Sequence, residues 1–441
     1  MTLGRDIRRT LLLAAPLVLG QLSAIAINFV DTVMAGRFDA LTLAAVAIGG
    51  AVWSAGLLFI IGVLMAIPPH VSRLHGARRL RQVGPFMHQA AWLALGLALL
   101  FFLYLRNAEP LLRLMRVDPQ IVPPALGYLD AISWSTPGLC GFLLLRMLSE
   151  GLSRPRPVMY FGLLGLAINI PANYVLIFGH LGFPPLGAVG CGYASALTLW
   201  LQLAAFLVYT WRQPAFRRTR LFRPLAPPHP ERLRQLLRLG LPIGASVFVE
   251  GSLFAAAALL LGALGPVITA AHQAAINWSG LMFMIPLGVG MAMTVRIGNA
   301  LGRRDPVAAR LAGRAGFRVV LVTQLASATF MLAFPGVVGH LYTSDPEVQG
   351  LIVQLLFLAA IFQLPDGFQA AAAGALRGYK DTRVPMLITV VAYWLVGLPL
   401  GWWLGIGAGF GARGMWVGLI AGLSLAALLM LLRYRRLARR P

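Results

Sequence analysis

The sequence is poor in charged residues and in the residue types on which most active sites depend. Charged side chains make up 12% of its 441 residues, and only two cysteines and one lysine are present. Cys140 and Cys191 both lie inside apolar runs, so neither a disulfide framework nor a cysteine metal cluster is expected. No H-E-x-x-H, G-x-S-x-G or P-loop motif stands at the edge of an apolar run. We therefore expect neither an enzyme nor a cofactor.

Apolar residues dominate instead, at 59% of the chain and a mean hydropathy of +0.77. This composition does not suit a soluble domain. A transmembrane helix needs ~20 mostly apolar residues, and the runs here are too long and too unalternating for barrel strands. We predict an all-α integral membrane protein with twelve transmembrane helices, at residues 11–34, 44–68, 86–105, 121–145, 158–178, 186–211, 236–261, 267–293, 317–338, 348–376, 386–404 and 414–432.

The basic residues alternate from loop to loop. If the N-terminus is cytoplasmic, all but five of the 37 basic residues lie on the inside; the five are Arg37, Arg106, Arg113, Arg116 and Arg413. This positive-inside bias predicts that both termini are cytoplasmic. It also accounts for the net charge of +23 without nucleic acid. We expect basic stretches such as RRTRLFR, residues 217–223, to meet the anionic surface of the lipid bilayer.

The chain repeats itself at a shift of 226 residues. Identities include Pro16/Pro242, Gly36/Gly262 and Met65/Met291, and the basic loops GARR and LGRR coincide. A second match between the halves pairs GLSRPRP with GYKDTRVP. Since each half has six spans, both enter the membrane from the same side. We predict an N-lobe at 1–215, a cytoplasmic linker at 216–234 and a C-lobe at 235–441 around a central cavity, which is a transporter layout.

Three acids, Asp31, Glu250 and Asp366, lie inside the apolar runs. A charge at mid-helix costs about 2.5–3.5 kcal/mol on insertion scales, and we expect all basic residues in loops or at helix ends. Each acid must then be protonated, hydrogen-bonded in a wet cavity or bound to a mobile cation. A protonated acid that only forms a packing hydrogen bond between helices remains an alternative. Three such acids together favour a functional role. The repeat partners of Asp31 and Glu250 are Ala257 and Ala24, so the lobes would carry different charges.

Other polar residues occur in pairs four residues apart. Asn169 and Asn173 flank a proline in INIPANY, and Gln273 and Asn277 lie in AHQAAINWSG. Residues four apart share a face of a helix, so each pair predicts a local polar site in the membrane. His272, at the start of the second motif, is expected to be a hydrogen-bonded packing residue.

Several motifs in order resemble the multidrug and toxic compound extrusion (MATE) family, in its NorM-like bacterial branch. They are VDTVMAGR, NIPANYVLIFG, AAHQAAINWSGLMFMIP, RIGNALG and GALRGYKDTRVP, and the resemblance extends over about residues 8–433. It implies two pseudo-symmetric bundles of six helices in the bacterial inner (plasma) membrane. It also implies antiport by a monomer, in which Na+ or H+ drives the export of cationic, often aromatic drugs.

The resemblance also implies roles for single residues. Coupling-ion roles would fall to Glu250, Asp366 and Asp31, and substrate or cavity roles to Asn169, Asn173, Gln273, Asn277 and Phe362. A bound Na+ would lie at Glu250 and Asp366. Phe362 stands where relatives often have tyrosine, so it keeps a π-face for a cation and loses the hydroxyl.

The alternative is a flippase for lipid-linked glycan precursors, which has a related architecture. Such proteins more often add helices or place several basic residues in the cavity to hold a pyrophosphate. This chain has twelve apolar runs and acidic residues inside them. A drug antiporter is therefore the favoured prediction, with the coupling ion left open between Na+ and H+.

Overall fold

The computed structural model describes residues 3–439, and within that range every regular element is a helix. Eleven helical stretches are long and apolar enough to cross a membrane. A twelfth span is the pair Val122–Ser133 and Thr136–Gly151, which is bent by 50° at a short break. Pro137, which lacks an amide proton, stands at the start of the second member of this pair. With the bent pair counted as one span, the prediction of twelve transmembrane helices is confirmed.

Contacts within the chain define two compact units, which we call the N-unit and the C-unit. The N-unit is Leu19–Gly240. Its elements are the second part of α1 (Leu3–Phe38), α2 (Ala40–Leu64), α3 (Ile67–Gly76), the short η1 (Leu80–Gln82), α4 (Val83–Arg106), α5 (Glu109–Leu114), α6 (Val122–Ser133), α7 (Thr136–Gly151), α8 (Arg156–Phe178), α9 (Ala188–Arg212), α10 (Pro214–Arg217) and the first part of α11 (Pro230–Gly262). Within it, α9 packs against α6, α7 and α8.

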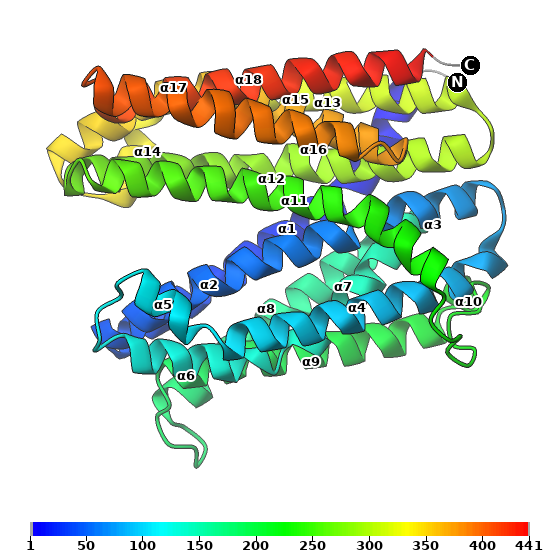
Figure 1. Cartoon of the computed structure of the whole chain (residues 1–441), viewed down its shortest axis with the longest axis horizontal. Helices are drawn as coiled ribbons and strands as arrows, with labels where there is room; N and C mark the ends of the chain where they lie inside the picture. Colours follow the sequence, from blue (N-terminus) through cyan, green and yellow to red (C-terminus); the bar gives the residue numbers. More distant parts are fainter. Residues whose placement is uncertain (1–2, 440–441) are drawn as a thin grey trace. The chain divides into compact units, whose positions relative to one another are not determined.

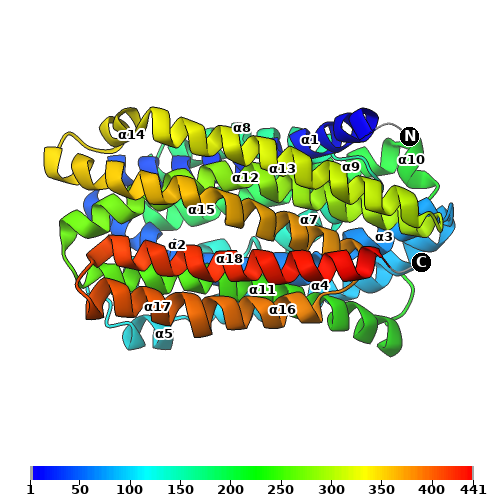
Figure 2. The ribbon, with the colours of Figure 1, turned by 90° about the horizontal axis from the view of Figure 1, so that it is seen from above.

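The C-unit contains the chain up to Val18 and from Leu241 onward. Its elements are the start of α1, the rest of α11, α12 (Pro266–Gly302), α13 (Pro306–Ala333), α14 (Pro335–Tyr342), α15 (Pro346–Gly378), α16 (Arg383–Val390), η2 (Val391–Gly397), α17 (Leu398–Trp402), η3 (Trp403–Gly407) and α18 (Gly411–Ala438). Both η2 and η3 are π-helical. The central helix is α15, which packs against α12, α13 and α18 (Figures 1 and 2).

The sequence repeat is also a repeat of helices. A shift of 226 residues carries the span Ala40–Gly76 onto Pro266–Gly302, both 37 residues long. The same shift brings the start of Leu80–Arg106 onto that of Pro306–Ala333. The two six-helix bundles are therefore copies of one design, as the sequence predicted.

Two helices are shared between the units. The division falls after Val18 in α1 and after Gly240 in α11, each within two residues of a proline, Pro16 or Pro242. These prolines are repeat partners, and a proline inside a helix removes one backbone hydrogen bond and bends the helix. The predicted lobes at 1–215 and 235–441 stay a prediction.

The segment that precedes α11, residues 221–229, is attached to α4 by hydrogen bonds. Side chains of α4 make five hydrogen bonds to the backbone of residues 221–229. His88 donates through Nε2 to the Leu221 carbonyl and accepts at Nδ1 from the Ala226 amide. At Gly84 a side chain would collide with the Thr219 carbonyl oxygen, 2.5 Å from the position of a Cβ. The predicted linker is thus held on the N-unit over most of its length.

The expectation that every basic side chain lies in a loop or at a helix end is wrong, and two arginines with buried side chains show how the helices accommodate the charge. Arg146 lies in α7, is 8% exposed and donates to Glu150 at 2.9 Å and to Gln21. Arg296 lies within α12, which continues nine residues past its predicted end at 293, and forms an ion pair with Asp6. Burying an arginine is tolerated here because an acid lies beside it.

Candidate functional sites

The N-unit places Asp31 at the centre of a buried polar cluster. Its carboxylate accepts hydrogen bonds from Nδ2 of Asn169 at 3.0 Å and from Nδ2 of Asn173 at 2.6 Å. Asn173 also donates to Asn169 at 3.0 Å, because the two lie one turn apart on α8. Asp31 is 7% exposed and both asparagines are fully buried. The three residues that the sequence singled out are thus in contact.

A fourth member of this cluster was missed. Ser195 of α9 donates its hydroxyl to Asp31 at 3.2 Å. The charge of Asp31 also acts on Tyr128 of α6 and Cys191 of α9. No local pattern marks Ser195, because its partner is 164 positions away and only helix packing brings them together.

The C-unit brings the other two acids together. Asp366 of α15 is 3% exposed and Glu250 of α11 is partly buried. Each lies within the electrostatic field of the other. Gln369, one turn after Asp366, is hydrogen-bonded to Glu250, and the guanidinium of Arg377 acts on the same carboxylate. The sequence analysis did not identify Gln369 or Arg377. It therefore assigned no positively charged partner to the two acids, whereas Arg377 supplies part of such a charge.

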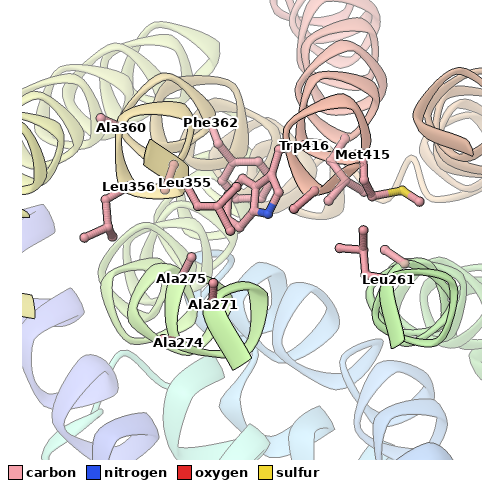
Figure 3. Close-up of a cluster of buried hydrophobic side chains, with 14 of the residues drawn as sticks. Leu261, Ala271, Ala274, Ala275, Leu355, Leu356, Ala360, Phe362, Met415 and Trp416 are labelled. Carbon is pink, nitrogen blue, oxygen red and sulfur yellow. The ribbon is translucent and has the colours of Figure 1, made fainter. Parts of the chain in front are cut away.

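Phe362 lies in a hydrophobic cluster one turn before Asp366. Its ring is 1% exposed and meets Trp416 of α18 edge to face, with the centroids 5.6 Å apart. The ring of Phe254 in α11 also meets the Phe362 ring edge to face, with the centroids 6.2 Å apart. Figure 3 shows Phe362 and Trp416 together, with Ala271 and Ala275 of α12 in the same cluster. The ring therefore makes a packing contact between α15 and α11, the helices that carry the two acids. Its role toward a substrate stays a prediction.

The polar residues of α12 divide between its exposed and buried faces. Gln273 and Asn277 are exposed and hydrogen-bonded to each other at 3.2 Å, as their spacing predicted. His272 is 1% exposed, and its Nδ1 accepts from the Trp416 indole at 3.2 Å. The prediction that His272 is a hydrogen-bonded packing residue is confirmed.

The polar cluster around Asp31 and the pair Glu250 and Asp366 both offer oxygen atoms of the kind that bind cations. Carboxylate, amide and hydroxyl oxygens are the ligands that hard cations such as Na+ prefer. Two neighbouring buried carboxylates repel each other when both are ionised, so a proton or a metal cation between them is stabilised.

Comparisons with known proteins agree with the fold and the repeat. The family model described as MatE matches residues 16–175 and 242–403. The two matched stretches begin at the repeat partners Pro16 and Pro242.

Full-length relatives give the same family. A protein of Xanthomonas campestris pv. campestris, named probable multidrug resistance protein NorM, is 48% identical over 435 residues, which is 99% of this chain and 95% of the relative. A Xylella fastidiosa protein of the same name is 44% identical over 437 residues, covering 99% and 93%. The solved structure of the eukaryotic MATE transporter AtDTX14 superimposes with a TM-score of 0.88, at 21% identity over 99% of this chain and 98% of that one. None of these names is that of an enzyme. The chain belongs to the MatE family.

Proposed function

We propose that this protein is a cation-coupled antiporter that exports cationic, aromatic drugs and other toxic compounds by alternating access. Relatives that span nearly the whole chain are named as multidrug resistance proteins. The observation that carries the coupling is the buried pair Glu250 and Asp366, held on two helices of one unit. An inward-moving Na+ or H+ would neutralise this pair and leave it again.

Coupling needs an interaction between the ion and the drug. We assign the ion site to Glu250 and Asp366, and its occupation lowers the affinity of the C-unit for the drug. Reciprocal linkage then requires the drug to weaken ion binding by the same factor. Asp31, with its three neutral hydrogen-bond donors, serves as a protonation switch on α1 in this scheme.

The exposed face of α12 supports a substrate role for Gln273 and Asn277. These side chains are exposed and polar, whereas Phe362 is enclosed in the C-unit. Asn169 and Asn173 are fully buried against Asp31 and so support the ion site more directly than a substrate site. A flippase for lipid-linked glycans is not favoured, because both named relatives are multidrug resistance proteins.

The remaining assignments concern location, orientation and oligomeric state. The protein is a multi-pass membrane protein, and we place it in the bacterial inner membrane as a monomer with both termini in the cytoplasm. Asp6 pairs with Arg296 and Arg310 donates to the Ala438 carbonyl, so the start of α1 and the end of α18 lie at the same end of the C-unit (Figure 1). This arrangement supports an even number of spans.

The test is dye efflux from proteoliposomes that contain only this protein. An imposed Na+ or H+ gradient should drive efflux by the parent without ATP. Glu250→Gln and Asp366→Asn should each lose at least nine-tenths of the gradient-driven rate, because the pair can no longer release a cation. Glu347→Gln, a change at an exposed acid of α15, is the matched control and should keep the parental rate.

Two results would contradict the proposal. Gradient-driven efflux by Asp366→Asn at the parental rate would remove that residue from coupling. Efflux that needs ATP, or no efflux by the parent under either gradient, would remove antiport itself.

A further inference from the structure

The surroundings of Glu250 and Asp366 contain two neutral oxygens whose hydrogen-bonding capacity is unused. Among the residues that the structure describes, Oη of Tyr393 and Oε1 of Gln369 have no hydrogen-bond partner. Tyr393 is fully buried and Gln369 is 3% exposed. Buried polar groups are nearly always paired, so two unpaired oxygens near one pair of acids indicate a ligand that they meet.

Gln369 lies beside both acids. It follows Asp366 by three residues on α15, which places the two side chains on one face of the helix. Its side chain is also hydrogen-bonded to Glu250. A glutamine that donates through Nε2 to a carboxylate keeps its carbonyl oxygen available. A neutral oxygen is therefore held next to the Glu250 carboxylate.

Tyr393 approaches from a third helix. Its neighbour Trp394 donates from Nε1 to the Val249 carbonyl at 3.3 Å, which brings residues 393–394 beside residues 249–250. The charges of Glu250 and Asp366 both act on the Tyr393 hydroxyl. Its ring belongs to the same hydrophobic cluster as Phe362. Apolar packing holds the ring, and the hydroxyl lies in the field of both acids.

The backbone around Tyr393 is unusual and tightly packed. Tyr393 lies in the π-helical segment η2, and π-helical turns inside helices occur often at functional sites. At Gly397, in the same segment, an added Cβ would lie 3.2 Å from the Cα of Gly422 in α18. This close approach restricts movement of η2 and keeps the hydroxyl in place before a ligand binds.

We infer that Gln369 and Tyr393 complete an oxygen-lined sodium site with Glu250 and Asp366, and that their neutral oxygens set the preference for Na+ over H+. The inference rests on the proposed function, because it names further ligands of the ion site assigned there. A bound Na+ has lost water oxygens and needs protein oxygens in their place. A proton needs one carboxylate oxygen only. Neutral oxygens therefore stabilise bound Na+ more than a bound proton.

The experiment measures equilibrium binding of radioactive Na+ to the purified full-length protein at constant pH. Tyr393→Phe removes one hydroxyl and keeps the ring, and Gln369→Leu removes the amide. Each should raise the Kd for Na+ at least tenfold. Tyr434→Phe makes the same change at a buried tyrosine that packs against Phe317 and Tyr379, and it should leave the Kd within twofold.

A second readout separates ion choice from general damage. In sodium-free proteoliposomes, proton-driven dye efflux by Tyr393→Phe should stay within threefold of the parent. In a separate measurement under an imposed Na+ gradient, its sodium-driven efflux should fall at least tenfold. The inference is overturned if the parent binds no Na+, if Tyr393→Phe binds Na+ like the parent, or if both kinds of efflux fall equally. Failure of the proposed function looks different, because Glu250→Gln and Asp366→Asn would then transport at the parental rate.

Discussion

Arg78 and Arg304, which are 226 positions apart, adopt the same left-handed backbone conformation, each with φ of 58°. Each follows the end of a helix in the same way: its amide bonds to the carbonyl three residues back, and the next amide to the carbonyl five residues back. These bonds define a Schellman motif. Ser153 and Lys380 repeat the pattern in the second pair of related loops. The internal repeat thus extends to single backbone angles.

The left-handed arginines give a prediction about stability. An L-residue in this conformation costs about 1–2 kcal/mol relative to glycine, and extra chain entropy of glycine in the unfolded state offsets about 0.4–1 kcal/mol of that. Arg304→Gly should therefore be more stable than Arg304→Val in thermal unfolding, by about 0.8 kcal/mol and at most about 1.6 kcal/mol. Both variants lose the same charge, so the comparison isolates the backbone.

Arg303 is the matched control for this comparison. It has a right-handed conformation with φ of −79°, where valine fits and glycine only adds entropy to the unfolded chain. Arg303→Gly should then be no more stable than Arg303→Val. The same order at both positions would show that the left-handed conformation is not the cause.

The polar cluster of the N-unit predicts a cost for removing one donor. Asn173→Ala takes away the 2.6 Å hydrogen bond to Asp31. A hydrogen bond to a charged group contributes about 1.5–3 kcal/mol, so the free energy of unfolding should fall by about that amount. Unfolding in detergent, followed by fluorescence, measures it. Asn277→Ala, at an exposed asparagine, should change it by less than about 0.5 kcal/mol; equal losses would contradict the burial seen here.

The buried ion pair between Asp6 and Arg296 predicts a strong coupling. Their side chains are 4% and 11% exposed, so removal of one partner leaves an uncompensated charge. Asp6→Ala and Arg296→Ala should each destabilise the protein by about 3 kcal/mol. The double variant should cost clearly less than the two single losses added together. Simple additivity in this double-mutant cycle would mean that the two groups do not interact.

The attachment of the linker to α4 can be tested by proteolysis. His88→Ala combined with Gln89→Ala removes four of the five side-chain hydrogen bonds to residues 221–229. Each bond contributes about 1 kcal/mol, and 1.4 kcal/mol is a tenfold change in the population of an open state. Trypsin should therefore cleave after Arg220 and Arg223 at least tenfold faster.

Gln82→Ala provides the control for this experiment. Gln82 is exposed in η1, just before α4, and has no part in the attachment. It should be cleaved at the parental rate. A double variant that resists trypsin as well as the parent does would mean that other contacts hold the linker.

Much of the membrane fold could be predicted because its signals are local. The apolar runs predicted all twelve spans, and the shift of 226 residues predicted a repeat that the helix bounds follow. The predicted ends of the helices were less accurate, as the region around Arg296 in α12 illustrates. Hydropathy falls where arginines begin, but α12 continues because its backbone bonds are satisfied and Asp6 neutralises the charge.

The residues of the candidate sites also divide into those that the sequence could identify and those that it could not. Asp31, Glu250 and Asp366 could be selected because a carboxyl group inside an apolar run is costly and therefore conspicuous. Asn169 and Asn173 could be paired because a helix places residues four apart on one face. Ser195, Gln369 and Tyr393 could not be found in this way. A serine, glutamine or tyrosine inside a transmembrane helix costs less than a charge and satisfies many environments.

The sequence alone determined that the chain is a twelve-span helical membrane protein with two related halves and three acids inside its spans, because hydropathy, periodicity and charge cost are read along the chain. Only the tertiary structure decided which side chains surround those acids. Ser195 reaches Asp31, and Trp394 brings Tyr393 to Glu250, through helices far apart in sequence. The positions of these helices relative to one another depend on how their side chains pack. No local sequence pattern predicts this packing.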